Sequence, residues 1–301
     1  MTRTVLTLGP TGRFGRNAAD AFAAAGWRTR KFQRGHDLTR AAQGADVIVN
    51  GLNPLYPDWS SQVPALTRDV ISAARASGAT VILPGNVYVF GAQTPAPWSE
   101  RSPHAAKNPL GQIRVRMEAA YREAGVRTIV LRAGDFLDTC ASGNWFDRIM
   151  IPKLAKGRFT YPGTPDIPHA WAYLPDLARA AVALAERRAE LPTFADVPFG
   201  GYTATGQEIA EGLARVTGQA VRLKRLNWLP LRLAAPVWPM ARCLLEMRYL
   251  WDTPHWLDGT RFDALVPGFR ATPLDAALAS AIPAALLQCQ IDPDQPVAAR
   301  A

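Results

Sequence analysis

Cysteine is scarce in this sequence. The 301 residues include three cysteines, Cys140, Cys243 and Cys289, and no two of them form a C-x-x-C pair. Histidine is almost as rare, with four residues, and none lies at metal-ligand spacing from a cysteine. These absences exclude a disulfide framework and a zinc-stapled fold, and they are typical of proteins from a reducing compartment. We therefore expect no bound metal and a cytoplasmic location.

Long uninterrupted hydrophobic runs are also missing. The longest apolar stretch, residues 228–251, is broken by Arg232, Arg242, Glu246 and three prolines. It is a poor candidate for a bilayer span, and the first 15 residues lack the apolar core of an export signal. We expect no transmembrane segment. The segment 228–251 is interpreted as a lid of a substrate lobe, with docking to a partner or a membrane surface as the alternative.

Lysine is uncommon as well, although the chain is basic. Lysine and arginine together number 34 against 25 acidic residues, a formal net charge of +9, but only five of the bases are lysines. The arginines are scattered, and no basic run is longer than a pair such as Arg187 and Arg188. A nucleic-acid surface needs a concentrated basic footprint, so we expect no nucleic-acid partner. The excess charge suits a small phosphate-bearing molecule.

Short apolar strands and helices alternate through the first half of the chain. Because the strands are continuously apolar, both of their faces are expected to be covered, as in a parallel sheet. This alternation predicts an α/β, Rossmann-type doubly wound sheet. Strands are expected at residues 4–8, 27–33, 45–49, 80–83 and 126–132, and helices at 17–25, 63–77 and 113–123.

The regular alternation of strands and helices ends after residue 132. We predict a Rossmann core in residues 1–135 and a smaller interleaved C-terminal substrate lobe in residues 136–301. Residues of about 174–200 are expected to return to the core, since a further helix and strand are predicted there. Such a lobe would close a cleft over the carboxyl ends of the strands.

A glycine-rich turn follows the first strand. Its pattern is G-x-x-G-x-x-G, from Gly9 to Gly15, at a predicted strand-to-helix junction. Glycines there allow a tight turn and a close approach of the backbone to a pyrophosphate, and the helix N-terminus supplies N–H groups. The predicted cofactor contacts in this turn are Gly9, Thr11, Gly12, Arg13, Phe14 and Gly15.

The end of the second strand indicates which dinucleotide is bound. An acidic residue about 20 positions after the glycines would hold a ribose 2′-hydroxyl, whereas an arginine accommodates a 2′-phosphate. No acidic residue lies between Asp20 and Asp37, and the strand ends in Arg34. With Arg13 as a helper, this predicts NADP(H) in preference to NAD(H).

These motifs resemble the short-chain dehydrogenase/reductase superfamily in its extended, epimerase/dehydratase-like form, over nearly the whole chain. The resemblance implies that Asp37 and Leu38 lie against the adenine and that Asn50 and Gly51 line the cofactor. Residues 86–91 match the family segment after a central strand, and residues 131–136 and 169–178 match its substrate side. It also implies a possible homodimer, paired through the helices around 63–77 and 107–123.

The family's usual catalyst is absent. None of the seven tyrosines has a lysine four residues later. By position, Leu110 replaces the tyrosine, Arg114 the lysine and Asn86 the serine, and leucine cannot transfer a proton. Arg114 would be a permanent cation that holds the ribose.

We therefore predict Tyr88 as proton donor, with Asn86 and Arg114 beside it, while a purely structural Tyr88 stays open. His169, Tyr173 and Asp135 are candidates for polar contacts. Lys107 and His104 are expected to face solvent.

Two functions fit these observations. The first is an NAD(P)-dependent oxidoreductase or epimerase acting on a small carbonyl or sugar(-nucleotide) substrate without the Tyr-x-x-x-Lys pair. The alternative is a catalytically inactive NADP(H)-binding sensor or regulatory protein, similar to NmrA-like members.

Overall fold

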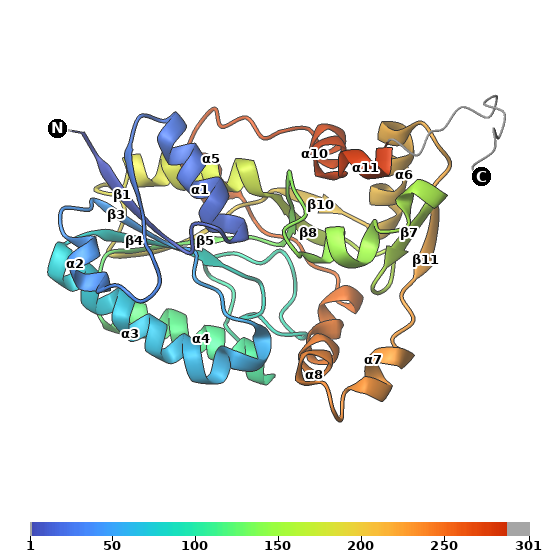
Figure 1. Ribbon diagram of the computed structural model, residues 1–301, viewed down its shortest axis with the longest axis horizontal. Helices are drawn as coiled ribbons and strands as arrows, with labels where there is room; N and C mark the ends of the chain where they lie inside the picture. Colours follow the sequence, from blue (N-terminus) through green and yellow to red (C-terminus); the bar gives the residue numbers. More distant parts are fainter. Residues whose placement is uncertain (1, 288–301) are drawn as a thin grey trace, which may run out of the picture.

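A parallel sheet of six strands forms the centre of one half of the molecule. The computed structural model describes residues 2–287, and every pairing within this sheet is parallel. The strand order is β2-β1-β3-β4-β5-β9, which confirms the predicted doubly wound α/β fold (Figure 1). The strands are β1 (Thr4–Leu8), β2 (Arg28–Lys31), β3 (Val47–Asn50), β4 (Thr80–Gly85), β5 (Thr128–Arg132) and β9 (Phe194–Pro198).

Helices cover both faces of this sheet. Alternate residues of a strand point to opposite faces, so Val47 and Val49 pack towards one helical layer and Ile48 towards the other. In Figure 1 the pair α1 and α5 lies above the sheet and the pair α3 and α4 below it. These helices are α1 (Arg13–Ala24), α3 (Trp59–Ser77), α4 (Pro109–Glu123) and α5 (Leu174–Glu186), with the short α2 (Leu38–Ala42) beside α3.

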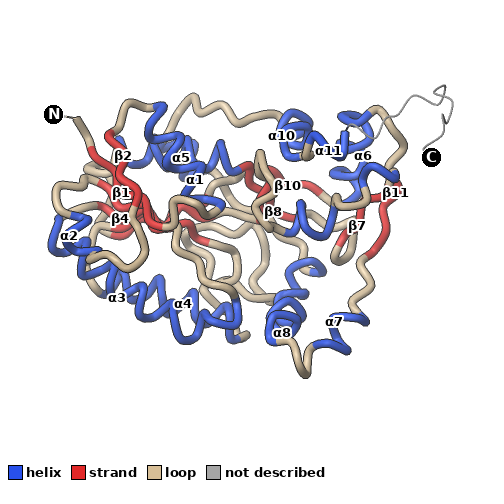
Figure 2. Tube along the Cα trace, in the orientation of Figure 1, coloured by secondary structure: helices blue, strands red, loops and turns tan. Residues whose placement is uncertain are grey.

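The second half of the chain builds two small sheets and a separate apolar core. One sheet has the order β10-β8-β6, and β7 pairs with β11 in the other (Figure 2). The strands are β6 (Asp135–Leu137), β7 (Arg158–Tyr161), β8 (His169–Tyr173), β10 (Tyr202–Ala204) and β11 (Arg222–Arg225). The helices are α6 (Gly206–Thr217), α7 (Leu229–Ala234), α8 (Pro239–Glu246), α9 (Thr260–Leu265), α10 (Leu274–Ala281) and α11 (Ala284–Leu287).

Several helices begin earlier than the apolar pattern predicts. α1 begins at Arg13 rather than residue 17, because Gly12 is extended and serves as its N-cap. α4 begins at Pro109 rather than residue 113, since proline suits the first helical turn. Both missed turns are polar or contain proline, so they carry little apolar periodicity. In consequence, Leu110 and Arg114 both lie within α4.

The segment 228–251 folds as two short helices, α7 and α8, followed by a 3-10 turn at Met247–Asp252. Between residues 2 and 287, no helix has the length and apolar character that a membrane crossing requires. Cys289 lies outside the described residues.

Candidate functional site

The glycine turn packs backbone against backbone at the carboxyl ends of β1 and β3. Gly9 has a φ of +63°, and a Cβ placed there would lie 2.7 Å from the carbonyl oxygen of Gly51. A Cβ on Gly15 would lie 2.1 Å from the carbonyl oxygen of Gly9. Side chains are therefore excluded at both positions, and Gly51 must be glycine too, because its Cβ would meet the Leu8 carbonyl oxygen at 2.7 Å.

Among residues 2–287, no side chain caps the N-terminus of α1, and the nearby Asp138 carboxylate accepts hydrogen bonds from the Arg16 and Asn17 side chains (2.7 and 3.2 Å). Gly12 caps it with extended backbone and no side-chain hydrogen bond, and its first turn holds no acidic residue. The helix dipole and the unpaired N–H groups of a first turn favour an anion. Thr11 is exposed at the tip of the turn, whereas Phe14 is buried between α1 and the sheet. This cradle fits the pyrophosphate of a dinucleotide.

The two arginines predicted to meet a 2′-phosphate are placed differently. Arg13 donates to the carbonyl oxygens of Ser142 (2.9 Å) and Gly143 (2.6 Å), so it ties the glycine turn to the second half of the chain. Arg34 is exposed just after β2, and its side chain forms no hydrogen bond or ion pair with residues 2–287. Arg34 is therefore the better placed of the two to meet a phosphate.

The other predicted cofactor residues also have roles in the fold. Asp37 accepts a hydrogen bond from the Arg40 N–H (3.1 Å) and caps α2, while Leu38 packs on the core. The Asn50 amide donates to the Tyr121 hydroxyl (3.1 Å), which fixes the end of β3. None of these contacts tests the cofactor assignments, which stay predictions.

Two tyrosine hydroxyls meet beyond the carboxyl end of β4. The hydroxyl oxygens of Tyr56 and Tyr88 are 2.6 Å apart, and the Tyr88 ring stacks on Trp59. Burial raises the pKa of Tyr88 well above its usual value, and the neighbouring Tyr56 and Asp135 act in the same direction. Burial also raises the pKa of Tyr56. The sequence singled out Tyr88 and missed Tyr56, which lies in a loop where no motif marks it.

Asn86 and Arg114 hold the backbone around this pair. Asn86 Oδ1 accepts a hydrogen bond from the Tyr88 N–H (3.1 Å). Arg114 donates to the Pro84 carbonyl oxygen (2.8 Å) and lies over the Trp59 ring, with Cζ 5.6 Å from its centroid. Burial lowers the pKa of Arg114, and its buried Nε has no partner among the described residues. The three predicted catalytic residues thus share one neighbourhood, although their chemical roles stay predictions.

The position of the usual tyrosine is closed to substrate. Leu110 is buried in the first turn of α4. Its N–H donates to Glu246 Oε1 (2.7 Å), and the Asn108 amide donates to the same oxygen (2.8 Å). A carboxylate from α8 therefore caps α4 where the family places its acid/base residue.

A second polar group lies on the side of β6 and β8. His169 Nε2 is 2.8 Å from Asp135 Oδ2, and its ring stacks on Trp251 at 4.3 Å with an interplanar angle of 2°. His255 packs edge-on against His169, and burial lowers the pKa of His255 well below its usual value. Because Asp135 raises the pKa of both Tyr56 and Tyr88, this group lies within electrostatic range of the tyrosine pair. Tyr173, in contrast, bonds Ser280 (2.8 Å).

A buried charge network joins β5, β9 and α4. Arg132 is fully buried and donates to Glu118 Oε2 (2.7 Å), to Asp196 Oδ2 (2.5 Å) and to the Asn86 carbonyl oxygen (2.7 Å). Burial disfavours the charged forms of Arg132 and Glu118, but the charge of Arg132 still lowers the pKa of Glu118. The network stabilises the segment that carries Asn86 and Tyr88.

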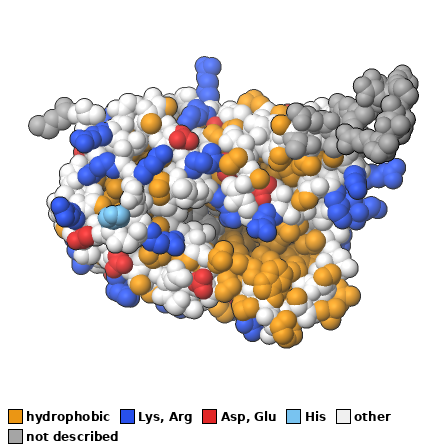
Figure 3. Space-filling view, in the orientation of Figure 1, with side chains coloured by type: hydrophobic (Ala, Val, Ile, Leu, Met, Phe, Trp, Pro, Cys, Tyr) orange, Lys and Arg blue, Asp and Glu red, His pale blue; other side chains and the backbone are white. Residues whose placement is uncertain are grey.

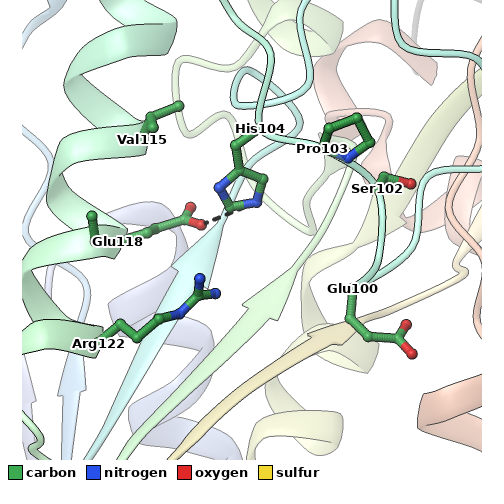
Figure 4. A pocket seen from close by; sticks show the side chains of 8 residues that line it. Glu100, Ser102, Pro103, His104, Val115, Glu118 and Arg122 are labelled. Atoms are coloured by element: carbon green, nitrogen blue, oxygen red, sulfur yellow. Dashed lines mark ion pairs between the residues drawn. The ribbon is translucent and has the colours of Figure 1, made fainter.

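His104, which is expected from the sequence to face solvent, is only partly exposed. It lies 3.9 Å from Glu118 and from Asp196, at the wall of a cavity of about 370 Å³ (Figure 4). Burial lowers the pKa of His104. Potential metal-ligand atoms of His104, Glu118 and Asp196 lie within 4.8 Å of one another. Arg132 already donates hydrogen bonds to both carboxylates as a buried cation, so the donor set does not fit a metal ion well.

Comparison with known proteins shows the fold. No family model matches the chain, and no curated protein matches its sequence. Among solved structures, a putative epimerase from Burkholderia cenocepacia shares 17% identity, with a TM-score of 0.73 over 96% of this chain and 99% of that one.

Two further structures were solved with ligands. The UDP-glucuronic acid 4-epimerase from Bacillus cereus, in complex with UDP-glucuronic acid and NAD, shares 14% identity, with a TM-score of 0.73 over 95% and 99% of the two chains. A human epimerase family protein with NADPH shares 18% identity, with a TM-score of 0.72 over 92% and 98%. These likenesses confirm the predicted Rossmann-type, doubly wound α/β fold.

Proposed function

We propose that this protein is an NADP(H)-dependent oxidoreductase or epimerase that acts on a small carbonyl or sugar(-nucleotide) substrate through a non-standard proton donor. One observation carries the proposal: glycine backbones packed under an uncapped helix N-terminus share a sheet edge with a partly buried pair of tyrosine hydroxyls. Proteins of the same fold have been solved with NADPH and with NAD plus a sugar nucleotide, which supports these ligand classes.

The glycine turn and the α1 N-terminus would hold the pyrophosphate, and Arg34 the 2′-phosphate. When bound, the dinucleotide supplies or accepts a hydride. Arg114 lies beside the tyrosines as a fixed cation, where it suits a ribose hydroxyl as acceptor. In this arrangement the second half of the chain contributes the Asp135 and His169 pair as substrate contacts.

Tyr88 is the proposed proton donor. Burial and Asp135 disfavour its phenolate, so the hydroxyl keeps its proton at neutral pH. Its Oη can give that proton to a substrate carbonyl oxygen, and Tyr56 can replace it through the hydrogen bond between the two hydroxyls. Because its pKa is raised, little Tyr88 phenolate is present at neutral pH to remove a proton from an alcohol.

The test is calorimetric titration of the purified protein with NADPH and NADH, followed by a nicotinamide absorbance assay against carbonyl and sugar-nucleotide compounds. We expect NADPH binding tighter than NADH binding, and turnover with at least one carbonyl class. Absence of binding to either dinucleotide would refute the whole proposal. NADPH binding with no turnover would favour the second function below.

The second candidate is an inactive NADP(H)-binding sensor similar to NmrA-like proteins. The observation in its favour is that buried Leu110 occupies the position of the usual tyrosine, where leucine cannot transfer a proton. A sensor needs the cradle but no proton donor. Turnover that disappears in a Tyr88→Phe variant would rule it out.

The homodimer through the outer faces of α3 and α4 and the cytoplasmic location stay predictions. Light scattering of the purified protein measures the first directly: a mass of two chains supports it, and a mass of one contradicts it.

A further inference from the structure

Large exposed hydrophobic side chains gather at one end of the molecule. Four of those in the described chain lie within ten residues of each other, on and between α7 and α8. Leu233 is 72% exposed and Val237 86%, and Leu229 and Trp238 are about half exposed (55% and 47%). Leu55, also exposed, precedes the 3-10 turn Tyr56–Asp58, against which α8 packs. We call these five residues the apolar tip. Figure 3 shows a hydrophobic area here, beside the hollow in the molecular surface.

The segment from residue 212 to residue 245, which holds four of the five residues of the apolar tip, carries positive charge without negative charge. No acidic residue occurs between Glu211 and Glu246, whereas six basic residues do. Arg215 pairs with Asp275. The other five are exposed and form no ion pair with residues 2–287, and β11, which carries three of them, leads directly towards α7 (Figure 1). These five are Arg222, Lys224, Arg225, Arg232 and Arg242.

The residues on either side of the exposed part of α7 and α8 are anchored to the rest of the molecule. Trp228 is buried and its Nε1 donates to the Pro162 carbonyl oxygen (2.7 Å). Glu246 caps α4, and Leu250 and Trp251 are buried in the cores just after it. Inward-facing residues thus secure both ends, while the apolar tip points outward. The exposed side chains are therefore presented by a fixed framework rather than left over from an incomplete core.

We propose that α7 and α8 dock this protein onto the surface of an anionic lipid bilayer. Exposed leucine, valine and tryptophan side chains suit the boundary between headgroups and acyl chains, and adjacent arginine and lysine side chains suit anionic headgroups. The negative surface potential of an anionic bilayer attracts Lys and Arg side chains and repels acidic ones. The absence of acidic residues from 212 to 245 therefore favours a lipid surface. The docking is interfacial, and it does not depend on the proposed catalytic function.

Vesicle flotation tests this docking with the full-length protein. The probes are vesicles of phosphatidylcholine alone and vesicles with about one third phosphatidylglycerol, at about 50 mM and about 500 mM NaCl. We expect flotation with the anionic vesicles at low salt and much less with the neutral vesicles or at high salt. Failure to float with anionic vesicles at low salt overturns the proposal, as does equal flotation with both kinds of vesicle.

Three variants locate the contact. Leu233→Gln with Val237→Gln removes two strongly exposed apolar side chains, and we expect vesicle affinity to fall about tenfold or more. Arg232→Gln with Arg242→Gln removes two cations, with an expected loss of about tenfold. The matched control is Arg68→Gln with Arg116→Gln, two exposed arginines on α3 and α4 that should leave affinity within about twofold.

All three variants replace exposed side chains, so their unfolding midpoints should stay close to that of the wild type. If the variant that combines Leu233→Gln and Val237→Gln does not fold, the single change Val237→Gln replaces it. If the control loses as much affinity as the Arg232 and Arg242 variant, binding is a property of net charge and the proposed docking face is wrong. Capture by a protein partner without vesicle binding would likewise contradict it.

Discussion

The two ends of the proposed cofactor cleft differ in which atoms form them, backbone atoms at one end and side chains at the other. At the glycine end, backbone atoms make the site: the Gly9, Gly15 and Gly51 backbones touch, and no side chain fits between them. At the tyrosine end, side chains make the site, and the positions for which the sequence resemblance implies a serine, a tyrosine and a lysine hold Asn86, Leu110 and Arg114. The difference shows that a backbone site depends on one residue type, whereas a side-chain site can be rebuilt from new residues once the fold positions them.

The largest expected effect comes from adding one methyl group at the glycine end. Gly9→Ala would place Cβ 2.7 Å from a carbonyl oxygen in a backbone region that already disfavours alanine. We expect a loss of about 3 kcal/mol or more in the free energy of unfolding and no measurable NADPH binding. Chemical denaturation and calorimetry measure these two quantities.

The control is Gly26→Ala, where φ is also positive (+77°) but no atom lies within 4 Å. We expect it to cost about 1 kcal/mol, with NADPH affinity unchanged. If the two variants lose equal stability, the contact between the Gly9 and Gly51 backbones has no role of its own, and the contrast between the two ends disappears.

At the tyrosine end, removal of one hydroxyl should affect chemistry and leave binding intact. We expect Tyr88→Phe to lower kcat about 100-fold or more, with the NADPH affinity unchanged. Tyr56→Phe, which removes only the second hydroxyl, should lower it about tenfold. Steady-state kinetics and calorimetry separate the two effects. Normal turnover by Tyr88→Phe would exclude Tyr88 as donor.

The pH dependence of the same reaction sharpens this test. Because the pKa of Tyr88 is raised above its usual value near 10, the donor stays protonated across the neutral and mildly alkaline range. We therefore expect the wild-type reduction rate to show no loss from deprotonation of a donor between about pH 7 and about pH 9.5. A fall with a midpoint below about 9 would indicate a different group.

An exposed arginine between these extremes should set cofactor preference. Arg34→Glu is expected to weaken NADPH binding about tenfold to 100-fold and to leave NADH binding nearly unchanged, since only NADPH carries the 2′-phosphate. Arg40→Glu makes the same charge change on a nearby exposed arginine and should shift both affinities by less than about threefold. Equal losses of NADPH affinity in both variants would indicate a general electrostatic effect rather than a direct contact between Arg34 and the 2′-phosphate.

The smallest expected effect concerns stability at acidic pH. Burial lowers the pKa of His255 below its unfolded value, so the folded state holds this ring neutral while the unfolded chain binds a proton below about pH 6.5. Stability is therefore complete above that pH and falls as the pH drops towards the folded pKa. His104 acts in the same direction.

Thermal unfolding at pH 7.5 and 5.5 measures this effect. We expect the wild-type midpoint to fall by about 3–5 °C between these conditions and that of His255→Gln to fall by less. An equal fall in both proteins would show that His255 does not contribute.

How much the sequence reveals follows the same division. Gly9 and Gly15 mark their own position, because only glycine meets the geometry and the preceding strand is strongly apolar. The alternation of buried strands likewise predicts the sheet. Tyr56, Glu246 and His255 could not be found in this way. They reach the site from separate parts of the chain, and no spacing within the sequence records that they meet.

The contact between Glu246 and the first turn of α4 links two surfaces with different proposed duties. α8 belongs to the segment proposed to lie on lipid, and α4 carries Arg114 one turn beyond the capped N–H group of Leu110. A shift of α8 at the bilayer would pull on the start of α4 and so change where Arg114 lies beside the tyrosine pair. The Glu246 carboxylate would then couple attachment to the bilayer with the arrangement of Arg114 and the tyrosine pair.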